Sequence, residues 1–252
     1  MIRTRRWLAG TGERARRRTP ATATATAAAK DRDGDGDGDA GAAGYSARWR
    51  PADEAAARQL IVTYEDEERF EFTGRQEAER LLPHVRGDAT VLDLGCGIGR
   101  IALYIAPHCA RLWAVDVSAE MLAMARRRLV GENNVRFATC SGTRVPDVET
   151  GSVDFLYSII VLQHLEREDA FLLLEECVRM LRPGGSAFIT WPNIADPEYL
   201  QSFVDYAHNG DVADRARARM YTTTELAVLL PRAGFSAVEV HDAPNIVTVC
   251  TR

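Results

Sequence analysis

From Tyr45 to the C-terminus, the sequence alternates short apolar segments typical of buried strands with segments whose apolar residues recur at helical spacing. This alternation predicts a parallel sheet with helices on both faces, because parallel neighbours need a crossover that is usually a helix. The expected strands are 90–94, 112–116, 135–138, 153–159, 187–191, 235–241 and 246–251. The last two are too close in sequence for a crossover and should form an antiparallel hairpin. We therefore expect an α/β fold with a doubly wound, mostly parallel sheet.

Helices are expected at 52–64, 74–84, 98–106, 120–130, 168–181 and 223–230. Pro107, Gly131 and Pro183 follow three of these segments, and both residue types favour the end of a helix. Thr222 or Thr223 suits the N-cap of the last helix. The segment 192–222 has a mixed, partly helical pattern.

Residues 1–44 differ from the rest of the chain, with a basic stretch, an Ala/Thr repeat and an Asp/Gly-rich end. After Leu8 they hold almost no large apolar residues, so they cannot bury enough surface to offset the entropy lost on ordering. We predict a disordered tail at 1–44 and one domain at 45–252. Arg5-Arg6 resembles a twin-arginine signal, but no apolar region follows, and an EF-hand reading of the Asp-rich end places Ala42 where glutamate is required. A wrongly assigned start codon is a further alternative for this tail.

Composition excludes several classes of protein. No run approaches the roughly 20 apolar residues that span a bilayer, so neither a membrane span nor a membrane partner is expected. The five cysteines are scattered and include no C-x-x-C pair, which argues against a disulfide framework and a zinc site. We expect a cytoplasmic location and no bound metal.

A glycine-rich loop is the most informative motif of the chain. Gly95, Gly97 and Gly99 occupy alternate positions between a buried strand and the next helix, where residues without side chains let a ligand approach the backbone. The segment 97–102 also satisfies the G-x-G-x-x-G/A pattern of dinucleotide-binding proteins, and a tight turn without a ligand is the alternative.

Two aspartates narrow the choice of ligand. Asp116 ends the second strand about 20 residues beyond the first glycines, where an acidic residue accepts hydrogen bonds from the hydroxyls of a ribose. Asp93 lies inside the first strand, and a carboxylate there suits a cationic group better than a pyrophosphate. S-adenosylmethionine carries an α-ammonium and a sulfonium and has no phosphate.

Four segments in order resemble the class I S-adenosylmethionine-dependent methyltransferases. They are Asp93–Gly97, Val115–Ser118 with Met121-Leu122, Val153–Ser158 and Leu181–Gly185. The resemblance runs from about Phe72 to the C-terminus and implies S-adenosyl-L-methionine as cofactor. It also implies a seven-stranded sheet with an antiparallel last strand, in agreement with the expected terminal hairpin.

The resemblance assigns the cofactor-binding residues. It implies that Asp93 holds the methionyl amino group and that Asp116 binds the ribose diol. The residues implied to line the methionine and ribose are Gly95, Cys96, Gly97 and Gly99, and those implied to surround the adenine are Val117, Met121, Ser141, Gly142 and Thr143. Ser158 and Ile159 are implied to border the sulfur. Ser141 departs from the family pattern, which often has an acidic residue near the adenine amino group. A serine hydroxyl can accept the same hydrogen bond without the charge assistance of a carboxylate.

His164 is the candidate catalytic residue. It follows the fourth strand closely, and methyl transfer needs a general base when the acceptor is a hydroxyl or a protonated amine. The alternative is an ordinary histidine in a turn. Arg75 is a candidate for the cofactor carboxylate, with a solvated arginine as the alternative. Candidate walls of an acceptor pocket are Tyr64, Tyr157, Trp191 and Tyr221, each with a core position as its alternative.

The charge of the domain indicates the class of acceptor. The whole chain has a net charge of −5, but the tail is basic, so residues 45–252 are distinctly acidic. An acidic surface opposes a phosphate backbone, so no nucleic-acid partner is expected, and Arg215, Arg217 and Arg219 form either a solvated face or contacts to an anionic acceptor. The expected partner is a small-molecule methyl acceptor, with a hydroxyl or amine of a secondary metabolite, sugar or lipid-like compound as the methylated group, covered by a lid at 45–88 and a cap at 192–222. A protein that binds the cofactor without methylating and an NAD-linked oxidoreductase are the alternatives.

Overall fold

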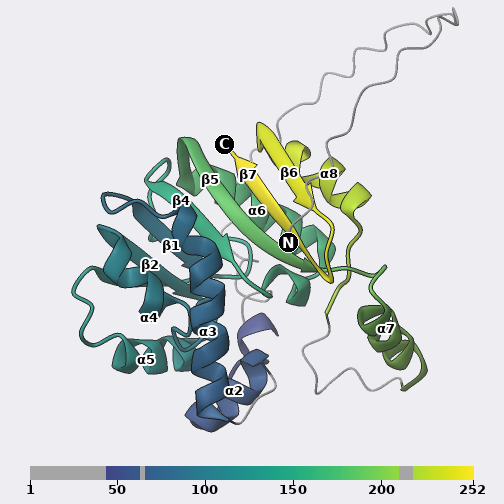
Figure 1. The fold of residues 1–252 in the computed structure, drawn as a ribbon, viewed down its shortest axis with the longest axis horizontal. Helices are drawn as coiled ribbons and strands as arrows, with labels where there is room; N and C mark the ends of the chain where they lie inside the picture. Colours follow the sequence, from purple (N-terminus) through teal and green to yellow (C-terminus); the bar gives the residue numbers. More distant parts are fainter. Residues whose placement is uncertain (1–43, 63–65, 210–217) are drawn as a thin grey trace, which may run out of the picture. The chain divides into compact units, whose positions relative to one another are not determined.

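The computed structural model describes residues 44–62, 66–209 and 218–252 (Figure 1). Its seven strands form one sheet in the order β3-β2-β1-β4-β5-β7-β6. The strands are β1 Thr90–Leu94, β2 Arg111–Asp116, β3 Val135–Thr139, β4 Val153–Ser158, β5 Leu181–Pro192, β6 Ala237–His241 and β7 Asn245–Thr251. Neighbours from β3 to β5 pair in parallel, while β7 is antiparallel to both β5 and β6. The expected α/β fold and terminal hairpin are confirmed, whereas the expected disordered tail lies outside the described residues.

Helices cover both faces of the sheet (Figure 1). They are α2 Glu54–Val62, α3 Glu67–Leu81, α4 Ala102–Ile105, α5 Ala119–Arg128, α6 Arg167–Met180, α7 Pro197–Asn209 and α8 Thr223–Arg232, with short 3₁₀ turns η1 Leu82–His84, η2 Ala106–His108 and η3 Leu162–His164. Helices α3, α4 and α5 share one apolar cluster with the sheet, and α6 and α8 share another.

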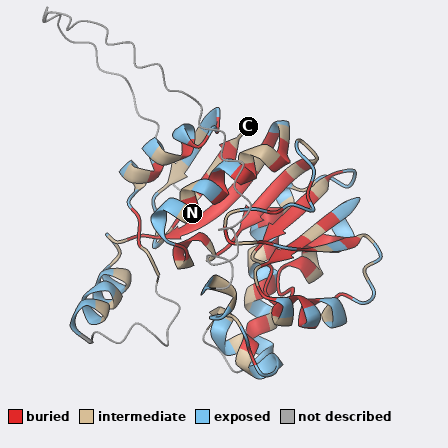
Figure 2. Cartoon of the chain, turned by 180° about the vertical axis from the view of Figure 1, so that it is seen from behind, coloured by how far each residue is buried: buried red, intermediate tan, exposed pale blue. Residues whose placement is uncertain are grey.

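The two clusters use alternate residues of each central strand, as strand geometry requires. In β1, Val91 belongs to the cluster with α3–α5, and Leu92 to the cluster with α6 and α8. In β4, Phe155 and Leu156 divide in the same way. Both faces of the central strands are therefore buried, and apart from Thr90 in β1 and Asp154 in β4, which are partly exposed, these strands carry the buried colour in Figure 2.

Three elements differ from their expected bounds. Helix α3 begins at Glu67 rather than near residue 74, because the Asp66 side chain caps it by accepting a hydrogen bond from Arg69 N at 2.9 Å. Helix α4 is limited to four residues, since the turns of the glycine loop continue into residue 101. Strand β5 already starts at Leu181, which pairs with β4 before a register shift, so residues 183–185 lie inside the strand.

The strand order places the glycine loop at a topological switch point. Strand β1 connects forward to β2 on one side and has β4 on the other, so the chain turns in opposite directions from this pair. Ligands of open α/β sheets bind beyond the carboxyl ends of the strands at such a point. The loop after β1 is held there because Gly95 N and Cys96 N both donate to Val115 O, at 2.7 and 2.9 Å.

Candidate functional site

A cavity lies beyond the carboxyl ends of β1, β2 and β4. The glycine loop forms its floor, and residues from the N-terminal helical segment and from the turn after β4 form its walls. Its lining consists of Tyr45, Trp49, Ile61, Asp93, Leu94, Gly95, Cys96, Gly97, Arg100, Ile101, Asp116, Val117, Met121, Cys140, Gly142, Ile159, Ile160, Val161, His164, Leu165 and Leu173. The cavity is thus mostly apolar, with three charged side chains and one histidine.

The glycine loop leaves no room for side chains at two positions. Gly95 has φ +80°, and a Cβ there would lie 2.3 Å from Val161 Cγ2. Gly97 has φ +54°, and its Cβ would lie 2.8 Å from Ile61 Cδ1. Both φ values belong to the left-handed region that favours glycine. The backbone of the loop therefore forms the cavity surface directly.

Asp116 lies at the end of β2 with both carboxylate oxygens bonded to backbone. Gly97 N donates to Oδ2 at 2.8 Å, and Ser118 N donates to Oδ1 at 2.9 Å. Burial raises the pKa of Asp116, and these hydrogen bonds act in the opposite direction. Each carboxylate oxygen has a second lone pair, so the side chain can still accept hydrogen bonds from a ligand in the cavity.

Asp93 lies at the same edge of the sheet and has an unsatisfied oxygen. Its side chain is buried, and Oδ2 has no hydrogen-bond partner among the residues that the structure describes. Burial raises its pKa to about 7; the Asp116 charge adds to the rise, while Tyr157 and the Arg100 guanidinium oppose it. A buried carboxylate without a partner is costly, and a cationic ligand group would remove that cost.

Arg100 is a charged lining residue that the sequence did not single out. It is only 5% exposed, and its Nη1 donates to Thr73 Oγ1 at 3.1 Å. Arg75, the arginine expected near the site, instead lies over the Tyr104 ring at 5.6 Å and is not part of the lining. The signal for Arg100 was its place directly after the third glycine, where the chain enters the cavity wall.

His164 ends the short η3 turn after β4 and lines the cavity. Its ring packs edge-on against Trp49, with 5.0 Å between the ring centroids. Arg219 Nη1 donates to His164 O at 3.1 Å, so the cap segment holds this turn. Ile160, which lies between β4 and this turn, has φ +55°, a rare and strained conformation for a β-branched residue. Residues 159–161 line the cavity together with His164.

Residues of the N-terminal segment close one side of the cavity. The Tyr45 hydroxyl donates to Asp169 Oδ2 at 2.5 Å and accepts from Glu166 N at 3.0 Å. The Ser118 hydroxyl donates to Trp49 O at 2.5 Å. Tyr45 and Trp49 are therefore tied to the ends of two different helices, α6 and α5. The sequence indicated a lid in this region without naming these two side chains.

The structure brings most of the expected site residues together. Those that line the cavity are Asp93, Gly95, Cys96, Gly97, Asp116, Val117, Met121, Gly142, Ile159 and His164. Gly99, Ser141, Thr143 and Ser158 are not part of the lining. Ser158 Oγ donates to Leu94 O at 3.0 Å, and Ser141 Oγ accepts from Arg144 N at 3.1 Å, so both hydroxyls bond to backbone.

The aromatic residues expected as pocket walls belong to the core instead. Tyr157, Trp191 and Tyr221 are each at most 2% exposed, and none lines the cavity. Tyr64, Arg215 and Arg217 lie outside the described residues. Arg219 is described and pairs with Glu166 as well as with His164 O. Its guanidinium therefore holds the turn after β4.

Comparison with known proteins relates this chain to methyltransferases in sequence and in fold. Residues 91–185 match the family model of a methyltransferase domain. The malonyl-[acyl-carrier protein] O-methyltransferase of Enterobacter lignolyticus is 33% identical over 51% of this chain and 50% of its own length. The phosphoethanolamine N-methyltransferase of Plasmodium falciparum is 28% identical over 41% of this chain and 39% of its own length. An S-adenosylmethionine-dependent methyltransferase from Aquifex aeolicus has a crystal structure with a TM-score of 0.57 at 20% identity, covering 79% of this chain and 98% of that one.

These comparisons support a class I S-adenosylmethionine-dependent methyltransferase. The cofactor of this methyltransferase family is S-adenosylmethionine. The chain spans about half the length, or less, of the two curated relatives named above. The similarity therefore supports methyltransferase activity, while the acceptor has to be argued from the site.

Two searches of the described residues bear on the chemistry of this methyltransferase. No group of three or more His, Cys, Asp or Glu side chains among them is arranged to hold a metal ion. None of the helices in the described ranges has the length and apolar character needed to cross a membrane.

Proposed function

We propose that this methyltransferase transfers a methyl group from S-adenosylmethionine to an oxygen or nitrogen of a small-molecule acceptor. The observation that carries the proposal is the unpartnered Oδ2 of Asp93, buried beside the glycine loop. A cofactor with an α-ammonium and without phosphate suits this carboxylate, whereas the pyrophosphate of a dinucleotide would meet two buried carboxylates, Asp93 and Asp116.

Each part of the cofactor has candidate partners in the cavity. Asp93 would hold the α-ammonium and Arg100 the carboxylate, since both line the cavity and their charges interact. Asp116 would accept hydrogen bonds from the ribose hydroxyls. Val117, Met121, Cys140 and Gly142 would surround the adenine. Ile159 would border the sulfur, while Gly99, Ser141, Thr143 and Ser158 would act only through the shape of the loops that they hold.

Positioning can supply most of the catalysis in this reaction. When bound, S-adenosylmethionine supplies a methyl group on a sulfonium that needs no further activation. The acceptor atom forms its bond to the methyl carbon as the carbon–sulfur bond breaks, leaving a neutral thioether. His164 would accept the proton of a hydroxyl or ammonium acceptor, because its ring lies in the cavity wall beside Ile160 and Leu165.

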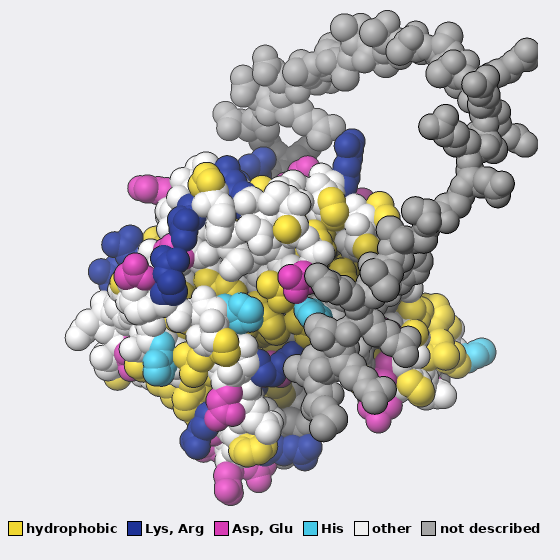
Figure 3. All heavy atoms as spheres, turned by 45° about the horizontal axis from the view of Figure 1, so that its top comes forward, with side chains coloured by type: hydrophobic (Ala, Val, Ile, Leu, Met, Phe, Trp, Pro, Cys, Tyr) yellow, Lys and Arg dark blue, Asp and Glu magenta, His cyan; other side chains and the backbone are white. Residues whose placement is uncertain are grey.

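The acceptor is proposed to be a small molecule, such as a secondary metabolite, covered by the lid at 45–88 and the cap at 192–222. The two curated relatives carry names that indicate methylation of oxygen in one case and nitrogen in the other. Basic and acidic side chains are mixed on the face shown in Figure 3. This mixture and the net negative charge of residues 45–252 disfavour a nucleic-acid acceptor.

The five cysteines are free and buried, which supports a cytoplasmic location.

Release of S-adenosylhomocysteine in the presence of candidate acceptors tests this function. Hydroxylated aromatic compounds, hydroxy and amino acids and simple amines are incubated with the protein and the cofactor, and both products are followed by mass spectrometry. We expect equimolar S-adenosylhomocysteine and methylated product. Binding of S-adenosylhomocysteine without turnover on any acceptor class would favour the non-methylating alternative.

Replacing Arg100 by methionine is expected to weaken S-adenosylhomocysteine binding by about 10- to 100-fold, because a charge-assisted hydrogen bond to the carboxylate is lost. Methionine keeps the apolar stem that packs in the wall. Isothermal titration of the variant measures the effect, and Thr73→Val is the matched control, since it removes only the hydroxyl that accepts from Arg100. Equal losses in both variants would show that Arg100 acts through packing alone.

A further inference from the structure

The loop between β3 and β4 reaches the cavity without a helix or strand of its own. Residues 140–150 lie in turns and irregular backbone, and Cys140 and Gly142 line the cavity. One end of the loop is fixed to the sheet, because Cys140 N donates to Asp116 O at 3.0 Å. What fixes the other end decides the shape of the wall at Gly142.

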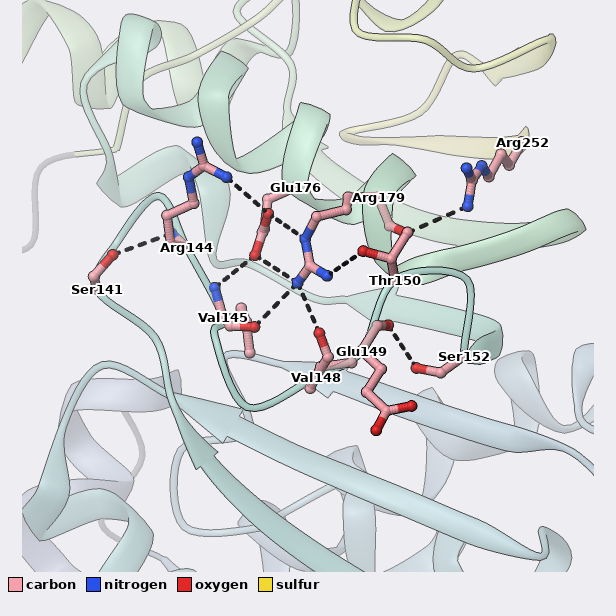
Figure 4. A network of polar contacts seen from close by, with 10 residues as sticks. All are labelled: Ser141, Arg144, Val145, Val148, Glu149, Thr150, Ser152, Glu176, Arg179 and Arg252. Carbon is pink, nitrogen blue, oxygen red and sulfur yellow. Dashed lines mark hydrogen bonds and ion pairs between the residues drawn. The ribbon is translucent and has the colours of Figure 1, made fainter. Parts of the chain in front are cut away.

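Glu176 of helix α6 supplies that second attachment (Figure 4). Its side chain is 3% exposed, and its Oε1 accepts from Val145 N at 2.8 Å. Although burial favours the neutral form, hydrogen bonds from Arg179 and Val145 lower the pKa of Glu176, so the carboxylate is charged at neutral pH. A buried charge of this kind is stable only while its partners stay in place.

Arg179, one turn further along α6, holds the same loop by donating hydrogen bonds to carbonyl groups of the loop (Figure 4). Its Nη2 donates to Val145 O at 3.2 Å and to Val148 O at 2.8 Å, and its Nη1 donates to Thr150 Oγ1 at 2.9 Å. The same guanidinium pairs with Glu176 through Nε and Nη2, each at 2.8 Å. The two side chains thus bind both the amide and the carbonyl of Val145.

A tight turn transmits this attachment to the cavity. Ser141 N donates to Arg144 O at 2.9 Å, and Arg144 N donates to Ser141 Oγ at 3.1 Å. Arg144 also forms an ion pair with Glu176 at 3.7 Å. Gly142 lies inside this turn with φ +96°, so its position follows from the positions of Ser141 and Arg144. Only Thr143 and Arg144 separate Gly142 from Val145.

We propose that Glu176 and Arg179 are positioning residues that hold the 140–150 loop in the shape that receives the adenosine half of the cofactor. The inference rests on the proposed function, since it assumes that the cavity at Gly142 takes the adenine. The pair does not contact the cofactor. It acts by keeping the free protein in the binding-competent state, so its loss reduces affinity by the fraction of molecules that leave that state.

The test compares Glu176→Gln and Arg179→Met with Asp154→Asn as a matched control. Asp154 has the same chemistry far from the cavity, because it accepts from Thr90 N at 2.8 Å and from Arg182 Nε at 2.5 Å at the amino ends of the strands. Isothermal titration measures the affinity of each variant for S-adenosylhomocysteine, which fills the whole proposed cofactor site, and for 5′-methylthioadenosine, which fills only its adenosine half. Thermal melting shows whether each variant is folded.

In Glu176→Gln and Arg179→Met, we expect both ligands to bind roughly 5- to 50-fold more weakly, because the adenosine half is common to them. Turnover at saturating cofactor should be retained once an acceptor is known, so the change should appear in KM rather than kcat. Asp154→Asn should bind both ligands as the wild type does. If one of the two variants fails to fold, the other provides the measurement, and loss of folding in both would show a general stabilising role and overturn the proposal.

Two further outcomes overturn the inference. One is unchanged affinity for 5′-methylthioadenosine in folded Glu176→Gln and Arg179→Met. The other is an equal loss in Asp154→Asn, which would show that lower stability alone weakens binding. Failure of the wild-type protein to bind S-adenosylhomocysteine is a different result, because it would contradict the proposed function itself.

Discussion

Replacing His164 by alanine is expected to lower turnover by about 10²- to 10⁴-fold for a hydroxyl or ammonium acceptor, the range typical of a lost general base. Affinity for S-adenosylhomocysteine should stay within about twofold, because the imidazole is assigned to the acceptor rather than the cofactor. The ring lies in the cavity wall next to Trp49, on a turn held by Arg219. Initial rates and isothermal titration of the same preparation measure the two quantities.

His84→Ala is the matched control for this prediction. His84 stacks on Phe155 with 5.5 Å between ring centroids and is not part of the cavity lining. Its loss should change stability and leave turnover close to the wild-type value. Unchanged turnover in His164→Ala would remove the general base from the mechanism and leave positioning as the source of catalysis.

Replacing Asp93 by asparagine should weaken S-adenosylhomocysteine binding by about 10- to 150-fold, the effect of losing a buried hydrogen bond to a charged group. Asparagine keeps the shape of the side chain but not the charge that suits an ammonium. Affinity for 5′-methylthioadenosine, which lacks the amino acid part, should change little. Equal loss for both ligands would show that Asp93 supports the glycine loop instead of binding the ammonium.

The pH dependence gives a second signature of Asp93. With its pKa raised to about 7, Asp93 in the free protein is mostly protonated at pH 6 and mostly ionised at pH 8. Wild-type affinity should therefore rise by roughly tenfold between these values, and the Asn variant should lose this dependence. Because the folded-state pKa lies above the unfolded one, Asp93 lowers the stability of the free protein as pH rises from about 4 to 7. Asp93→Asn should accordingly melt at a higher temperature than the wild type at pH 8 without ligand.

The sheet could be predicted from sequence because its central strands are buried on both faces. Short, largely apolar segments such as residues 90–94 and 153–158 predict strands that are buried between two layers of helices. The short separation of β6 and β7 gave the terminal hairpin. The start of α3 at Glu67 was missed, since its first turn is acidic and mostly exposed, and only the Asp66 cap marks it.

The floor of the site was predictable and its walls were not. The sequence pattern around the first two strands was enough to predict four site residues. These are Asp93 and Asp116 near the strand ends, and Gly95 and Gly97 in the loop that follows the first strand. Arg100 had a local signal in its place directly after Gly99, whereas Tyr45 and Trp49 reach the cavity through tertiary packing, which no spacing in the sequence encodes. For the same reason Arg75 was expected near the site but packs on Tyr104.

The attachment of the 140–150 loop also depends on tertiary structure. Glu176 lies on α6, more than 30 residues after Gly142 in the sequence, and its partner within the loop backbone is Val145 N. A buried glutamate on an amphipathic helix cannot be told from a solvated one by composition, and neither can its pairing with Arg144 and Arg179. The structure was needed to show that its carboxylate meets the loop.

Titration of the protein with S-adenosylhomocysteine, in parallel with NADH, tests the central claim most directly. We predict one molecule of S-adenosylhomocysteine bound per chain, with binding that strengthens from pH 6 to pH 8, and no binding of NADH. Binding of NADH without binding of S-adenosylhomocysteine would contradict the account, because the site would then hold a dinucleotide.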